Sequence, residues 1–342
     1  MRIINEKNYG LEILRMILCF WVLCFHCLKE SNNNIILSFK RKMFHVPSFF
    51  FISFYFLFPV IKSRNINKMR QRLIRLSISY IFWPLITFSF NNILFLLKIK
   101  SRYKRFLLLK ELIMQWIIGR KFFGQFWFLF NLLLLTIFFF ILSLSFSNKY
   151  FFIIIELFCI ISYILQYSSY NYTFFDFYPD SISHSVGHFV ETFPIAVFAF
   201  ILYNIGLMNI LLNCRYKSLL FSIIGNYFIF KYEIFKTIEI YGKKYNYNGF
   251  DKNVFAILSF ISFYSIPFDS QYLKKIKVFI RLISNYTQGI YCLHIIISYY
   301  SSHYLHQKRT FNGCIIIYLL SYIICFIGTK ISFNTKMKYL FI

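Results

Sequence analysis

The stretch Gln125–Phe146 reads QFWFLFNLLLLTIFFFILSLSF and carries no charged side chain. An α-helix rises about 1.5 Å per residue, so about 20 apolar residues cover the roughly 30 Å hydrocarbon core of a bilayer. A helix that is apolar on every side is buried in a large core or spans a membrane. This stretch is long enough to span, and it predicts a transmembrane helix.

Apolar runs of similar composition recur along the whole chain. Only helices and closed barrels can cross a bilayer, and runs of this length indicate helices. We therefore expect an all-α fold, a polytopic transmembrane helix bundle of about ten spans. Residues 1–342 are expected to form a single membrane domain. The expected spans are 11–28, 46–61, 73–97, 125–146, 151–166, 191–212, 217–231, 253–268, 282–301 and 312–331.

Composition favours a multi-pass membrane protein over a nucleic-acid-binding one. The chain is 58% hydrophobic and 15% charged, whereas soluble chains carry about a quarter charged residues. The net charge is +26, but Lys and Arg lie in the short connections between apolar runs, as membrane-flanking charges do. We expect a lipid bilayer and no nucleic acid as partner. Nearly equal numbers of Lys and Arg fall on the two sides of a ten-span topology, so the positive-inside rule does not orient the chain.

Two connections between the expected spans are distinctive. The basic segment 98–123 contains an amphipathic stretch, Leu107–Ile118, that we expect on the membrane surface. The segment 167–190 is the most polar connection. Its His184 and His188 could join Glu191 in a small metal site or at an acceptor, or they could lie in a solvated loop.

The eight cysteines lie mostly in or beside the apolar runs and show no framework typical of secreted domains. Buried free thiols are therefore expected. Cys24 and Cys27 form a C-x-x-C pair about 60° apart on a helix, but a zinc site would need further ligands at that level. We expect no metal site.

The first span carries charge where charge is costly, which tends to mark function. Glu12 and Arg15 are one turn apart, and His26 follows Arg15 by three turns, so the three share one face. Arg15 and His26 are separated by roughly 16 Å along the axis. They would occupy two depths of one cavity, which suits a long substrate. The alternative is an Arg that reaches one interface and a His packed near the other.

Five motifs follow one another along the chain. They are Glu12-Ile13-Leu14-Arg15 followed by His26, His45-Val46-Pro47 through Ser53, Arg70 through Arg75, Gln125-Phe126-Trp127-Phe128-Leu129, and Thr287-Gln288-Gly289-Ile290-Tyr291-Cys292-Leu293-His294. In this order they resemble the motifs of acyltransferase family 3, the polytopic acyltransferases that modify surface sugars. The chain departs from the family pattern at two positions: Phe54 stands where the family usually has Gly, and Gln71 stands where one arginine of a paired-arginine motif is expected. The pair is then Arg72 with Arg75, or Arg70 with Arg75.

The resemblance implies a reaction and roles for particular residues. The chain would move an acyl group, usually acetyl, from acyl-CoA to a hydroxyl of a carbohydrate or glycolipid acceptor, with no permanently bound cofactor. His26 would be the general base, since its reference pKa near 6.5 suits proton exchange at neutral pH. The cations would bind CoA phosphate or the thioester carbonyl. These cations are Arg15, Arg72 and Arg75.

Three further residues have supporting parts in this hypothesis. Glu12 would pair with the arginines and lower the cost of burying them. His294 packs in the bundle interior or contacts substrate. Trp127 is an interface anchor, a core aromatic or a substrate contact. Two other readings of the chain stay open, a polytopic transporter or channel and an inactive member of the same family.

Overall fold

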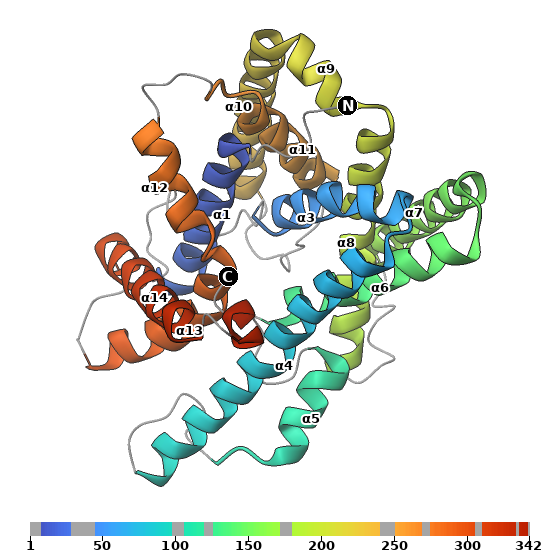
Figure 1. The fold of residues 1–342 in the computed structure, drawn as a ribbon. Helices are drawn as coiled ribbons and strands as arrows, with labels where there is room; N and C mark the ends of the chain where they lie inside the picture. The colour runs from blue at the N-terminus through green and yellow to red at the C-terminus, as the bar shows by residue number, and fades with distance from the viewer. Residues whose placement is uncertain are drawn as a thin grey trace. The chain divides into compact units, whose positions relative to one another are not determined.

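The computed structural model describes residues 8–28, 45–97, 106–119, 126–171, 180–239, 250–268, 274–304, 310–332 and 335–340. Within these ranges every regular element is a helix, which confirms the all-α prediction (Figure 1). The chain divides into two compact units, residues 1–53 with 201–331 and 341–342, and residues 54–200 with 332–340. The single membrane domain over 1–342 stays a prediction.

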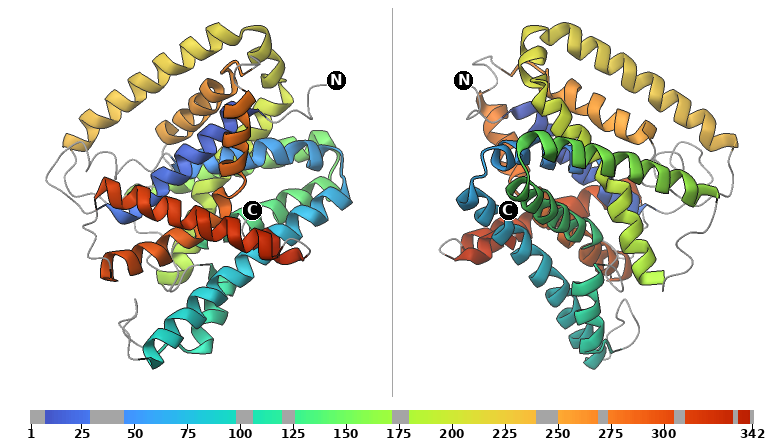
Figure 2. Two further views of the ribbon diagram at one scale, coloured as in Figure 1. Left: turned by 60° about the vertical axis from the view of Figure 1, so that its left-hand side comes forward. Right: turned by 90° about the vertical axis from the view of Figure 1, so that its right-hand side faces the viewer.

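Helix α1 (Tyr9–Cys27) is the packing centre of the first unit. It contacts four other helices of that unit, and α10 packs along α11 (Figure 2). These helices are α11 (Phe250–Tyr264), α12 (Lys274–Ser284), α13 (Thr287–Tyr304) and α14 (Phe311–Ile331). The unit also contains α9 (Leu207–Asn213), α10 (Arg215–Glu239), the start of α3 (His45–Lys62) and the end of α8 (Asp180–Asn204).

The start of α1 is tied to the end of α11. The Asn8 side chain accepts a hydrogen bond from the Leu11 amide (3.0 Å) and donates one to the Tyr264 carbonyl (3.1 Å). It therefore caps one helix while it holds the other. One residue into the helix, Gly10 lies so close to α11 that an added Cβ would overlap the Phe263 carbonyl oxygen.

At the other end of α1, cysteines fill much of the contact with α14. The side chains of Cys24 and Cys27 reach hydrogen-bond contact with Cys314, within a buried cluster that also contains Leu23 and Ile317. All eight cysteines are free thiols. Seven are buried, and Cys214, in the turn between α9 and α10, is exposed.

The second unit is organised around α4 (Ile66–Leu96), a helix of 31 residues. It packs against α5 (Leu109–Ile118), α6 (Trp127–Ser145) and the 3-10 helix η4 (Lys336–Leu340). Polar side chains hold these contacts by bonding to carbonyls. Tyr80 donates to Gln115 and Trp116 of α5 (2.8 and 2.9 Å), and Trp83 donates to Leu340 (3.1 Å).

An aromatic cluster fills the rest of this unit's core. It joins α6 to α3 and to α8. Parts of both α3 and α8 belong to the first unit. Helix α7 (Asn148–Asn171) packs on α6. Phe54 is fully buried, with ring centroids 5.7 Å from Phe139 and 6.0 Å from Phe200. The large ring at this motif position is therefore accommodated by other rings.

The helices confirm most expected spans but correct several bounds. Of the described helices, seven are long and apolar enough to cross a membrane. The predicted spans 217–231, 253–268 and 282–301 correspond to α10, α11 and α13, which are not among these seven. The seven lie at Tyr9–Cys27, His45–Lys62, Ile66–Leu96, Trp127–Ser145, Asn148–Leu165, Gly187–Asn204 and Phe311–Ile331.

Two expected spans have wrong bounds, because each contains a turn. The span 191–212 breaks after Asn204, and Gly206 takes a left-handed φ of 76° before α9. The span 282–301 breaks at residues 285–286, between α12 and α13. The expected connection 167–190 was also too long, because α7 runs to Asn171 and α8 begins at Asp180. Residues 172–179 lie outside the described ranges.

The surroundings of Gly10 and Gly187 predict opposite effects on stability when each is changed to alanine. Gly10→Ala should destabilise the protein by about 1–3 kcal/mol, because α1 must move away from the Phe263 carbonyl. Gly187→Ala, in α8, meets open space and should stabilise by up to about 1 kcal/mol through helix propensity. Thermal unfolding of the purified chain in detergent measures both. Equal effects of the two changes would contradict the close contact.

Candidate active site

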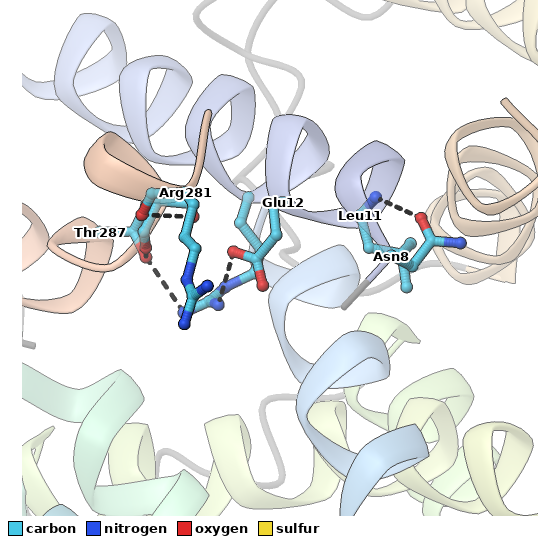
Figure 3. Close-up of polar contacts among 7 residues, drawn as sticks. Asn8, Leu11, Glu12, Arg281 and Thr287 are labelled. Atoms are coloured by element: carbon cyan, nitrogen blue, oxygen red, sulfur yellow. Dashed lines mark hydrogen bonds and ion pairs between the residues drawn. The ribbon is translucent and has the colours of Figure 1, made fainter. Parts of the chain in front are cut away.

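The face of α1 that was predicted to carry Glu12, Arg15 and His26 has an ion pair at its amino-terminal end. Arg15 Nη1 lies 3.2 Å from Glu12 Oε2, one turn away (Figure 3). The Arg15 side chain is 35% exposed and that of Glu12 13%. The pair is therefore open on one side, so part of the guanidinium can still bind a ligand.

A second helix fixes the direction of the Arg15 guanidinium. Its Nη2 donates to the Thr287 hydroxyl at the start of α13 (3.2 Å), and that hydroxyl donates to the Ser284 carbonyl (3.0 Å). The Cys19 thiol donates to the Thr287 carbonyl (3.4 Å). In the sequence, Thr287 is the first residue of the last motif, and no role was predicted for it. It anchors Arg15 across 272 positions of sequence.

His26 lies at the other end of α1 and is exposed. Its ring centroid is 5.3 Å from that of His294 on α13, with an interplanar angle of 36°. His294 is 1% exposed, and its Nδ1 lies 2.6 Å from the Tyr291 carbonyl oxygen. A carbonyl only accepts, so His294 carries a proton on Nδ1. The structure thus brings together the two histidines that the sequence singled out.

A third histidine of this unit was not predicted as a site residue. His45, the first residue of α3, is buried, with its ring centroid 5.7 Å from Phe25 and 6.4 Å from Trp21. Phe25 also contacts the ring of His26 edge-on at 5.0 Å. The signal in the sequence was a histidine directly before Val46 and Pro47 at the start of an apolar run.

In the second unit, α4 places Arg72 and Arg75 on one face and Arg70 on another. Arg72 and Arg75 are three positions apart and share a face, and their charges interact. Arg70 projects about 140° away from Arg75 around the helix and lines a groove on the surface of α4. Of the two pairings left open by the motif, the geometry brings together Arg72 and Arg75.

Trp127, at the start of α6, is 7% exposed and stacks on His188 with ring centroids 4.1 Å apart and planes 20° apart. His188 Nδ1 lies 3.0 Å from Glu191 Oε2, and Thr192 donates to the His188 carbonyl (2.8 Å). The solvated-loop reading of these residues was wrong, because His188 and Glu191 lie in α8 and His188 is buried. The His184 side chain lies outside the described part of the chain.

The candidate residues fall into both units. Arg15, Glu12, His26 and His294 belong to the first, whereas Arg72, Arg75 and Trp127 belong to the second. Across the described ranges, no group of three or more His, Cys, Asp or Glu side chains could hold a metal ion.

Comparison with known proteins assigns nearly the whole chain to one family. Residues 8–330 match the sequence model of a family described as an acyltransferase domain. No curated protein matches the chain, and no solved structure does.

The Arg15 anchor predicts that the Thr287 hydroxyl stabilises the protein through one hydrogen bond to a charged group. Thr287→Val should lower stability by about 1–2 kcal/mol, whereas Thr287→Ser, which keeps the hydroxyl, should change it little. A thermal-unfolding cycle with Arg15→Gln tests the coupling. Once Arg15 is replaced, Thr287→Val should cost distinctly less. Strictly additive effects would show that the contact contributes nothing.

Proposed function

The chain belongs to acyltransferase family 3, a family of membrane acyltransferases, and we propose that it transfers an acetyl group from acetyl-CoA to a hydroxyl of a carbohydrate or glycolipid acceptor. The observation that carries this proposal is His26, an exposed imidazole at one end of α1 whose ring lies against buried His294. Acyl-CoA is the donor substrate, and no cofactor stays bound.

In the proposed reaction His26 acts as general base. It takes the proton of the acceptor hydroxyl as that oxygen attacks the thioester carbonyl. The tetrahedral intermediate then collapses, the bond from carbon to sulfur breaks, and the CoA thiolate leaves. The proton on His26 passes to that thiolate, so the products are an acetyl ester and free CoA.

His294 is proposed to position His26. Its Nδ1 is committed to the Tyr291 carbonyl, so its ring orientation is fixed within α13. A ring held 5.3 Å away limits the directions in which the His26 side chain can turn. Direct contact of His294 with substrate is the second role that we propose for it.

Arg15 is proposed to bind the phosphates of CoA. Glu12 and Thr287 hold its guanidinium, while a third of the side chain stays exposed. A guanidinium held in one orientation loses less entropy when it binds an anion, and its fork of donors matches phosphate. About 16 Å separate Arg15 from His26 along α1, a span that the pantetheine arm of CoA largely covers.

The remaining candidates act at the donor thioester and the acceptor. Arg72 and Arg75 are proposed to bind CoA phosphate or to stabilise the oxyanion that develops on the thioester carbonyl. Trp127, whose ring orientation is set by stacking on His188, is proposed as a substrate contact. These roles rest on the motifs and on the local geometry of the second unit.

The first test measures transfer from labelled acetyl-CoA to a mixed glycan pool in membranes that contain the full chain. His26→Ala should reduce transfer by about 10²- to 10⁴-fold, the contribution of a general base. His294→Ala should leave measurable activity. Cys214→Ser, at an exposed thiol in the α9–α10 turn, serves as the control at matched expression. Equal labelling by the wild type and His26→Ala would remove His26 as the base and shift attention to His294.

A second test separates phosphate binding from carbonyl binding by Arg15. Arg15→Gln should raise the KM for acetyl-CoA about tenfold, the scale of one charge-assisted hydrogen bond. The same variant and the wild type should behave alike with acetyl-pantetheine, which lacks the nucleotide phosphates. A loss of kcat with both donors would instead place Arg15 at the thioester carbonyl.

A further inference from the structure

A groove of about 480 Å³ runs along one face of α4 in the second unit, with Phe140 of α6 on its wall. Its lining residues on α4 recur at intervals of three and four positions from Ile66 to Phe82, which is the spacing of one helix face. The groove therefore follows the helix for about 24 Å.

The wall of the groove is almost wholly aliphatic and aromatic. It includes Leu73, Ile74, Ile78 and Ile81, and its only charged side chain is Arg70, near one end. A ligand with many polar groups would lose its hydrogen bonds to water here without replacement, at a cost of a few kcal/mol for each group. The chemistry of the wall thus fits a hydrocarbon chain and disfavours the adenine and amide groups of CoA.

The length of the groove fits one chain of a membrane lipid. From Arg70 to Phe82 the helix rises about 18 Å. One leaflet contributes about half of the roughly 30 Å hydrocarbon core, or about 15 Å. A lipid chain that fills the apolar part of the groove would therefore bring its headgroup to the level of Arg70.

The charge at that end of the groove is positive. Arg70 is exposed, and no described side chain forms an ion pair or hydrogen bond with it. Lys62, Arg64 and Lys68 lie nearby in sequence and are also exposed, and residues 31–110 contain no Asp or Glu. An anionic headgroup is the complementary partner, and a guanidinium binds phosphate through two parallel hydrogen bonds.

Arg70 has no part in the binding of CoA phosphate or of the thioester carbonyl, which is proposed for Arg72 and Arg75. Arg72 and Arg75 share a different face of α4, so the groove does not depend on that pair. We propose that the groove holds one acyl chain of an anionic phospholipid, with the headgroup phosphate bound by Arg70. This lipid site is independent of the acyl transfer proposed above.

The test is native mass spectrometry of the full chain, purified in a neutral detergent and mixed with phosphatidylglycerol or phosphatidylcholine. The wild type should retain phosphatidylglycerol in preference. Arg70→Gln should weaken its retention about tenfold, to the level of phosphatidylcholine. Lys68→Gln removes the same charge two positions away, outside the groove, and should retain the preference. Equal loss in both variants would show a general charge effect and overturn the assignment to Arg70.

Filling the groove tests the acyl-chain part of the proposal. Ser77→Phe should abolish retention of both lipids while all surface charges stay in place. Ile74→Trp serves the same purpose if the first variant unfolds, with gel filtration and thermal unfolding as checks on the fold. Unchanged retention in a folded filled variant would overturn the groove as the site. Displacement of the lipid by CoA at equal concentration would show that Arg70 binds the acyl donor and not a lipid headgroup, which would overturn the proposal.

Discussion

Backbone polar groups in hydrocarbon have no water to bond, so the protein itself must satisfy them. Helices do this for the backbone, and many polar side chains of this protein also bond to backbone carbonyls. Hydroxyls fold back onto carbonyls one turn earlier, as Thr136 does to Leu132 and Ser321 to Ile317. Longer side chains use carbonyls of other helices, as Asn8 and Tyr80 do. The Arg15 anchor follows the same pattern, because the Thr287 hydroxyl accepts from the guanidinium and donates its own proton to the Ser284 carbonyl.

The helices were predictable wherever an apolar run was long and uninterrupted, as in Trp127–Ser145. The breaks at Gly206 and at residues 285–286 were not, because hydropathy averages over a window that is much longer than either turn. Gly206 offered a signal, since its left-handed φ is one that glycine adopts without strain. Tyr286 offered none, because a buried aromatic ring in a turn reads as one more apolar residue.

The site was predictable along one helix and much less so between helices. Periodicity placed Glu12 beside Arg15, and the structure confirms that contact. It could not place Thr287 against Arg15 or His294 against His26, since more than 260 positions separate each pair. The family motifs include Thr287 and His294, but they do not name Thr287 as a partner of Arg15. His188 was expected in a connection, because polar residues surround it in the sequence, whereas it lies within α8 and is buried.

Because the other seven cysteines are buried, Cys214 is the exposed thiol at which a surface label can react. A maleimide reagent that cannot cross the bilayer would attach at that thiol alone, with no engineered cysteine. Labelling of intact cells or of inverted vesicles would then reveal which compartment the α9–α10 turn faces. This one thiol would thus report the side of the membrane on which the α9–α10 turn lies, which the nearly equal numbers of Lys and Arg in the connections do not.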